Sequence, residues 1–126
     1  MGREKRVLIV DDERVIADTL RAIFSNEGYS ARAAYSAEDA LPLIAEWNPQ
    51  IVIIDVRLPG MNGIDLAVIM KAQFPHCNSL LFTGDGSVAY LHELARQQGH
   101  DFELLAKPIP PGELLNRVAG YFPPVA

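Results

Sequence analysis

The sequence is poor in the features that would place a protein outside the cell or across a membrane. Its 126 residues include one cysteine, Cys77, so no disulfide can form within the chain, which suits a reducing compartment. The N-terminus lacks an apolar core followed by a cleavage site, and no apolar run is long enough to cross a bilayer. These absences predict a cytoplasmic protein that does not enter a membrane.

The sequence also lacks the positive charge and the clustered histidines that two further classes of function need. Lys and Arg number 11 against 16 Asp and Glu, and a net charge of -5 disfavours binding to DNA or to an anionic membrane. The three histidines are scattered without the spacing of a metal site. Internal repeats and long linkers are absent as well. We therefore expect a single domain over residues 1–126 with no direct contact to nucleic acid.

The most informative stretch is a run of β-branched residues that ends at a carboxylate, from Ile51 to Asp55. An unbroken apolar run of this kind is typical of a strand with both faces covered, as in a parallel sheet. Pro59 and Gly60 follow and end the strand. Asp55 is thus predicted at the carboxyl end of a buried strand, where open α/β sheets bind their ligands.

Five strand patterns alternate with five helix patterns along the chain. The predicted strands are residues 6–10, 30–34, 51–55, 79–83 and 102–106, and the predicted helices are residues 13–26, 36–48, 63–74, 87–98 and a last one after Pro110-Pro111. Right-handed crossovers then give a flavodoxin-like, doubly wound parallel sheet. The strands interrupted by Arg32 and Glu103 are predicted at the edges, which fits the order 2-1-3-4-5. Pro42 lies inside the second helix, where we expect a kink or a late start.

Polar side chains follow the predicted strands and would meet at one edge of such a sheet. They are Asp11, Asp12, Asp55, Thr83 and Lys107. Two carboxylates about 4 Å apart repel by about 4 kcal/mol at an effective dielectric of about 20, so the cluster should hold a proton, a cation or both. An all-oxygen site suits Mg²⁺, which keeps waters and accepts phosphate oxygens. A carboxylate nucleophile, a metal site, a lysine and a hydroxyl are also the parts that phosphoryl transfer uses.

Four segments resemble the motifs of the receiver domain of two-component response regulators of the chemotaxis-regulator type. They stand in the family's order, and they are VLIVDDE, IVIIDVRLPGMNG, LLFTGDG and LLAKP. The resemblance implies that Asp55 accepts a phosphoryl group from the phosphohistidine of a sensor histidine kinase or a histidine phosphotransfer protein. It implies that Asp12, Asp55 and the backbone carbonyl of Arg57 bind Mg²⁺, with Asp11 acting through a water.

The same resemblance assigns roles to the residues of the switch. Lys107 pairs with the phosphoryl group, its bond to Pro108 is cis, and the hydroxyl of Thr83 swings toward the phosphoryl group. The change then spreads to the fourth helix, the fifth strand and the fifth helix. Leu104 is a departure, because the family usually has an aromatic residue there that rotates inward with the threonine. The implied protein is a signalling phosphoacceptor with an unknown output partner, not a metabolic enzyme.

Other interpretations fit parts of this set of residues. A pseudo-receiver that never takes phosphate is favoured by Leu104 and opposed by the full set of acids. A magnesium phosphohydrolase with an aspartyl nucleophile usually has a second acid two residues on, where this chain has Arg57. The chain is either a stand-alone regulator or the receiver part of a longer DNA-binding or enzymatic protein.

The third predicted helix, residues 63–74, is apolar almost all round. Surface helices usually keep a polar stripe, so this pattern indicates either a contact surface or a strand-covering helix with a few exposed apolar side chains. A contact surface would serve another protein or a second copy, including a dimer that forms on phosphorylation.

Arg57 and Asp85 stand two residues after the acceptor and two after the switch hydroxyl, at positions that tune dephosphorylation in the family. We expect the two side chains to pair across the mouth of the site and to slow the attack of water. Replacing Arg57 with Ala should therefore shorten the lifetime of the phosphoryl group on Asp55, measured as loss of phosphoprotein after the donor is removed. Equal lifetimes in parent and variant would reject the pairing.

Overall fold

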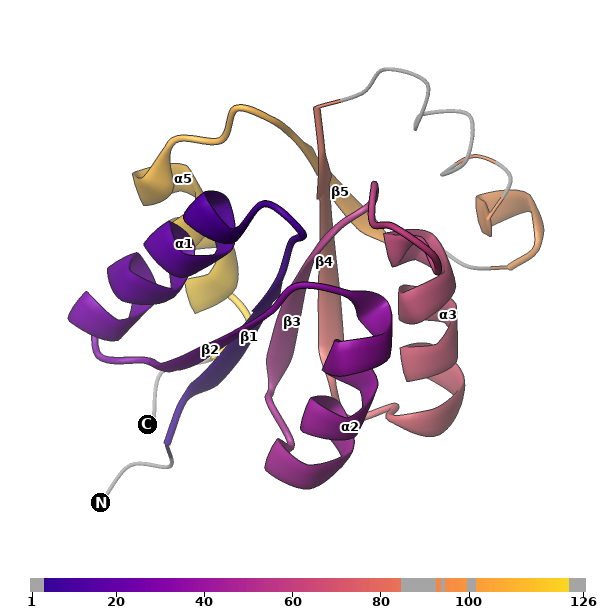
Figure 1. Ribbon diagram of the computed structural model, residues 1–126, viewed down its shortest axis with the longest axis horizontal. Coiled ribbons are helices and arrows are strands. Elements are labelled where there is room, and N and C mark those ends of the chain that lie inside the picture. Colours follow the sequence, from indigo (N-terminus) through magenta and orange to yellow (C-terminus); the bar gives the residue numbers. More distant parts are fainter. Residues whose placement is uncertain (1–3, 85–92, 94, 100–101, 123–126) are drawn as a thin grey trace.

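The computed structural model describes residues 4–84, 93, 95–99 and 102–122, and its centre is a five-stranded parallel sheet (Figure 1). The strands are β1 (Arg6–Val10), β2 (Ser30–Ala34), β3 (Ile51–Asp55), β4 (Asn78–Thr83) and β5 (Glu103–Ala106). The helices described from end to end are α1 (Arg14–Asn26), α2 (Ala37–Trp47), α3 (Gly63–Gln73) and α5 (Pro111–Ala119). The fourth predicted helix falls largely outside the described residues, where residues 93 and 95–97 are helical.

The order of the strands is β2-β1-β3-β4-β5, which confirms the predicted flavodoxin-like topology. All five residues of β3 are buried, because β1 and β4 flank the strand and helices cover both its faces. The strands that carry Arg32 and Glu103 lie at the two edges, as predicted. A charged side chain is tolerated there because an edge strand is open to water on one side.

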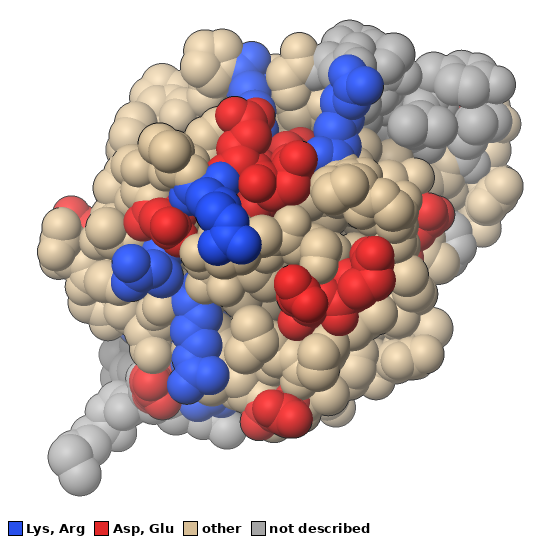
Figure 2. Space-filling view, in the orientation of Figure 1, with Lys and Arg blue, Asp and Glu red and all other residues tan. Residues whose placement is uncertain are grey.

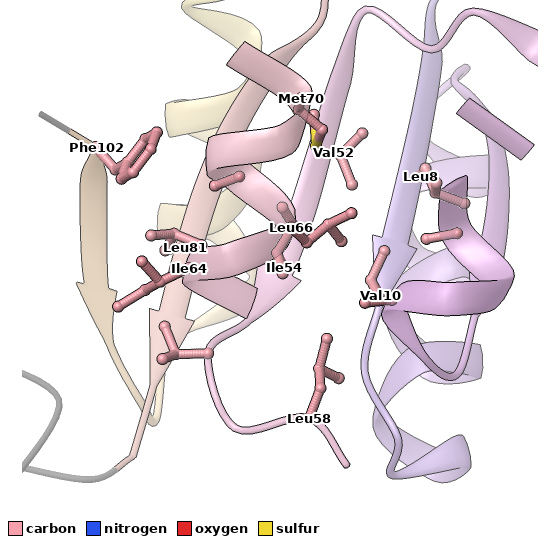
Figure 3. Close-up of a cluster of buried hydrophobic side chains, with 14 of the residues drawn as sticks. Leu8, Val10, Val52, Ile54, Leu58, Ile64, Leu66, Met70, Leu81 and Phe102 are labelled. Carbon is pink, nitrogen blue, oxygen red and sulfur yellow. The ribbon is translucent and has the colours of Figure 1, made fainter. Parts of the chain in front are cut away.

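Two apolar layers hold the helices against the sheet. In Figure 1, α1 and α5 lie on one side of the strands and α2 and α3 on the other. Because side chains alternate along a strand, neighbouring residues of one strand enter different layers. The α1–α5 layer contains Val7, Ile9, Phe24, Ile51, Ile53, Leu80, Phe82, Leu105, Leu114 and Val118. Figure 3 shows the α2–α3 layer, in which Leu66 and Met70 of α3 lie beside Val52 and Ile54 of β3.

The ends of α2 and α3 follow from their capping residues. The hydroxyl of Ser36 accepts a hydrogen bond from the Asp39 N–H at 3.0 Å, and the Asn62 side chain accepts one from the Asp65 N–H at 2.9 Å. Helix α2 begins at Ala37 and continues past Pro42, so of the kink or late start expected from this proline the late start is wrong, and the kink stays a prediction. Across the described ranges, no helix has the length and apolar character that crossing a bilayer requires.

The start of α3 packs directly on the end of β3, and this contact requires a glycine. A Cβ atom at Gly63 would lie 2.3 Å from the carbonyl oxygen of Asp55 and 2.9 Å from the Cα of Val56. The Gly63 N–H donates to the Val56 carbonyl at 2.9 Å, which fixes the close approach. The backbone that carries Asp55 is therefore held between β4 and the first turn of α3.

Replacing Gly63 with Ala should destabilise the fold by about 2 kcal/mol or more, because backbone atoms that cannot move aside would meet the new methyl group. Gly112 in α5 is the matched control, since a Cβ there meets nothing within 4 Å. Gly112→Ala should be neutral or stabilise the fold by up to about 1 kcal/mol. Urea unfolding of the two variants measures both changes, and similar values would contradict the close packing at Gly63.

Candidate functional site

The carboxyl ends of the parallel strands meet at one edge of the sheet, and the predicted polar side chains gather there. Asp11 and Asp12 follow β1, Asp55 ends β3, Thr83 ends β4, and Lys107 follows β5. Carboxylate oxygens of the three aspartates all lie within 4.8 Å of one another. Figure 2 shows acidic side chains gathered on the upper part of this face, with basic side chains on several sides of them. The predicted convergence is therefore present in the structure.

Lys107 joins two of these acids. Its Nζ lies 3.3 Å from Oδ2 of Asp11 and 3.3 Å from Oδ2 of Asp55. The Lys107 N–H donates to the Thr83 carbonyl at 2.7 Å, and the bond to Pro108 is cis, as predicted. Burial alone would lower the pKa of the ammonium, but the charges of Asp55 and Asp11 outweigh burial and raise it. Lys107 is therefore a fixed cation at neutral pH.

Asp55 is an acid held in an unfavourable environment. Its residue is only 5% exposed, and Oδ1 accepts one hydrogen bond from the Arg57 N–H at 3.1 Å. Burial, and then the neighbouring charge of Asp11, raise the pKa of Asp55 from 3.8 to about 6, although Lys107 acts in the opposite direction. One ammonium thus leaves part of the repulsion among the acids uncompensated, and a further cation would stabilise the ionised cluster.

Asp11 and Asp12 are placed differently, although they are neighbours in sequence. Asp11 is fully buried, and its Oδ1 accepts from the Glu13 N–H at 3.0 Å while its Oδ2 contacts Lys107. Asp12 is exposed, so its carboxylate is open to water. The cluster found among the described residues offers carboxylate oxygens only, without thiolate or imidazole. This donor set, open to water at Asp12, fits a hard divalent cation such as Mg²⁺.

The remaining predicted residues lie close to the acids or outside the described part. Thr83 is buried at the end of β4, one residue after Phe82, which pairs with Asp55 in the sheet. Leu104 is partly buried and packs against the α2–α3 layer, so its side chain belongs to the hydrophobic core. Asp85 lies outside the described residues, and its pairing with Arg57 stays a prediction.

The structure adds one contact that the sequence did not predict. The Lys107 Nζ lies 4.5 Å from the centroid of the Phe82 ring, within the range of a cation–π interaction. In the sequence, Phe82 is one more apolar residue of a buried strand. Its position directly before Thr83 placed Phe82 near the carboxyl edge of the sheet. The alternation of side chains along a strand does not show that its ring contacts Lys107.

Comparison with known proteins assigns the family. Residues 7–119 match the sequence model of the response regulator receiver domain. The chain belongs to the response regulator receiver domain family. It is also 37% identical over 114 residues to the response regulator protein FleR of Pseudomonas aeruginosa, a match that covers 90% of this chain and 24% of FleR. The receiver chain thus spans about a quarter of the length of this relative.

Solved structures of receiver domains share the fold. The signal receiver domain of an HD domain-containing protein from Pseudomonas fluorescens Pf-5 is 30% identical, with a TM-score of 0.85 and 95% of each chain covered. A CheY-like receiver domain from Methanospirillum hungatei JF-1 is 27% identical, with a TM-score of 0.84, and the match covers 94% of this chain and 93% of that one. Receiver domains are the signalling phosphoacceptor modules of two-component systems, and membership implies a cognate histidine kinase. The predicted family, fold and class of function are confirmed.

The raised pKa of Asp55 makes the ionised carboxylate a cost to the folded, metal-free protein. Because the folded pKa of about 6 exceeds the ordinary 3.8, this cost grows as pH rises from 3.8 to about 6 and then stays constant. Asp55→Asn removes the charge and should raise the unfolding free energy at neutral pH, in EDTA, by about 1–3 kcal/mol. Urea unfolding measures this difference.

Asp65→Asn is the control for this comparison, because Asp65 is an exposed acid in the first turn of α3. A carboxylate there interacts favourably with the helix dipole, so its loss should cost a few tenths of a kcal/mol. A lower stability of Asp55→Asn than of the parent protein would show that the charge of Asp55 is well compensated without metal.

Proposed function

We propose that this receiver domain accepts a phosphoryl group on Asp55 from the phosphohistidine of a sensor histidine kinase or a histidine phosphotransfer protein, and that phosphorylation changes partner binding. One observation carries the proposal. Lys107 is 52 residues from Asp55 in sequence, yet its ammonium lies 3.3 Å from the Asp55 carboxylate at the strand edge, beside Asp11 and Asp12. A structural ion pair between Lys107 and Asp55 does not explain why Asp11 and Asp12, whose negative charges repel that of Asp55, lie so close to it.

In the proposed reaction, a carboxylate oxygen of Asp55 attacks phosphorus. The new P–O bond forms as the P–N bond of the phosphohistidine breaks, and the electron pair stays on the imidazole nitrogen. The carboxylate is oriented beforehand, because the Arg57 N–H holds Oδ1 and Lys107 holds Oδ2. Lys107 then neutralises a phosphoryl oxygen, and the Thr83 hydroxyl donates a hydrogen bond to another.

We further propose that Asp12, Asp55 and the carbonyl of Arg57 hold Mg²⁺, with Asp11 acting through a water. Two observations support this assignment of direct and water-mediated ligands. Both oxygens of Asp11 already accept from Glu13 and Lys107, whereas Asp12 is exposed and free to face the ion. When bound, the ion would screen the charge of the carboxylate from that of the incoming phosphoryl group.

The proposal extends to the setting in which the domain acts. Residues 1–126 form one receiver unit that works in the cytoplasm, without direct contact to nucleic acid. Its output partner is unidentified, and a phosphorylation-dependent dimer through α3 is one form the output can take. The partly exposed Val68 and Ile69 of α3 support such a contact. The pseudo-receiver alternative is weakened by the complete acidic cluster, and the phosphohydrolase alternative by Arg57.

Mass spectrometry after incubation with acetyl phosphate and Mg²⁺ tests the proposal. The parent protein should gain one phosphoryl group, because the site can accept it from a small donor without the kinase. The adduct should be absent from Asp55→Asn and from a parent sample with EDTA, and present in Asp65→Asn. An adduct that persists in Asp55→Asn would place the acceptor elsewhere. Turnover of phosphate esters without an adduct would instead favour the phosphohydrolase.

A further inference from the structure

The ring of Phe82 lies against the one lysine of the site. Its centroid is 4.5 Å from Nζ of Lys107, whose ammonium also lies 3.3 Å from the carboxylates of Asp11 and Asp55. The ring belongs to the strand beside Asp55, since Phe82 pairs with Asp55 and its carbonyl accepts from the Val56 N–H at 3.0 Å. The backbones that carry the acid and the ring are therefore fixed relative to each other by sheet hydrogen bonds.

We propose that Phe82 is a positioning residue for phosphoryl transfer, whose ring face keeps the Lys107 ammonium between Asp11 and Asp55 until the phosphoryl group arrives. This inference rests on the proposed function of Asp55. An ammonium has three N–H donors. Two of them are used by the carboxylates, and the ring offers a negative face to the third.

The lysine needs such a restraint because its stem is flexible and its head is partly open to water. The Lys107 side chain is 21% exposed, and an ammonium on four methylene groups has many rotamers that point into solvent. The stem passes beside Gly84, where a Cβ would meet Lys107 Cβ at 3.6 Å. Lys107, Gly84 and the Phe82 ring border one pocket of about 460 Å³, whose other lining residues include Ile16, Leu20, Ile109 and Leu114. Ile16, Leu20, Ile109 and Leu114 are apolar, so among the described residues that line this pocket the Phe82 ring is the group that attracts the ammonium.

A purely structural role for Phe82 is the alternative, because the residue is 2% exposed in the α1–α5 layer. Phe24 provides the comparison, since it is fully buried in the same layer, and its ring lies against Tyr29 with centroids 5.3 Å apart. Both rings fill core volume, but Phe82 also faces the reactive cation. A change that alters the charge of the ring face and keeps its shape therefore separates the two roles.

The test places 3,4,5-trifluorophenylalanine at position 82, which withdraws electron density from the ring face with little change in shape. The rate constant for phosphorylation by acetyl phosphate at saturating Mg²⁺ should fall roughly three- to tenfold, the effect of losing a cation–π contact at a partly buried ammonium. The same amino acid at position 24 should leave the rate unchanged. Phe82→Leu should lower the rate at least as much. Phe82→Tyr keeps an aromatic ring, and its rate should stay within about twofold of that of the parent.

NMR of Lys107 provides a readout that does not depend on phosphorylation. The methylene protons next to Nζ should show an upfield ring-current shift in the parent protein, which Phe82→Tyr keeps and Phe82→Leu loses. Absence of this shift in the parent, or an unchanged rate with the fluorinated ring at position 82, would overturn the positioning role while Asp55 remains the acceptor. A parent protein that takes no phosphoryl group at all would instead overturn the proposed function.

Discussion

The structure of the site depends on one ammonium held between two buried carboxylates. Lys107 contacts Asp11 and Asp55 at 3.3 Å each, yet the pKa of Asp55 is still raised to about 6, because burial and Asp11 outweigh the lysine. Charge balance is therefore incomplete, and with Asp12 also present the cluster carries excess negative charge. Such a site is poorly satisfied by itself and well suited to a divalent cation. The cost of ionising Asp55 and the fit of the cluster to a divalent cation therefore have the same cause, which is negative charge that Lys107 does not fully balance.

The rest of the fold stabilises this unfavourable cluster. The strand that carries Asp55 is buried along its whole length, and its side chains enter two apolar layers on opposite faces of the sheet. Gly63 lets α3 begin directly against the carbonyl of Asp55, so the acid cannot withdraw from its neighbours by a shift of the backbone. A rigid, apolar scaffold thus keeps acids together that would separate in a flexible loop.

The sequence predicts those parts of the structure that follow from periodicity and from parallel strands. Asp55 ends an unbroken apolar run, and once the sheet is parallel, its approach to Lys107 follows from topology. The charged residues Arg32 and Glu103 interrupt two of the apolar runs, and this pattern correctly predicted that their strands lie at the edges of the sheet. Of the kink or late start expected from Pro42, the late start is wrong, because the Ser36 side chain caps the helix and sets its first residue at Ala37, ahead of the proline. The contact of Phe82 with Lys107 was missed, since it depends on side-chain rotamers that periodicity does not determine.

The two apolar layers on opposite faces of the sheet include different residues close to the site. A movement of Lys107 therefore affects the two layers differently. Leu104 pairs with Leu81 and packs in the α2–α3 layer, where an aliphatic side chain has no ring to exchange between exposed and buried positions. Phe82 packs in the α1–α5 layer beside Leu114 of α5 and is at the same time in contact with the Lys107 ammonium. If Lys107 moves toward a phosphoryl oxygen, the ring loses a cation on its face while its neighbours in α1 and α5 remain. Phe82 therefore links the charge of the site to the α1–α5 layer, on the opposite face of the sheet from Leu104.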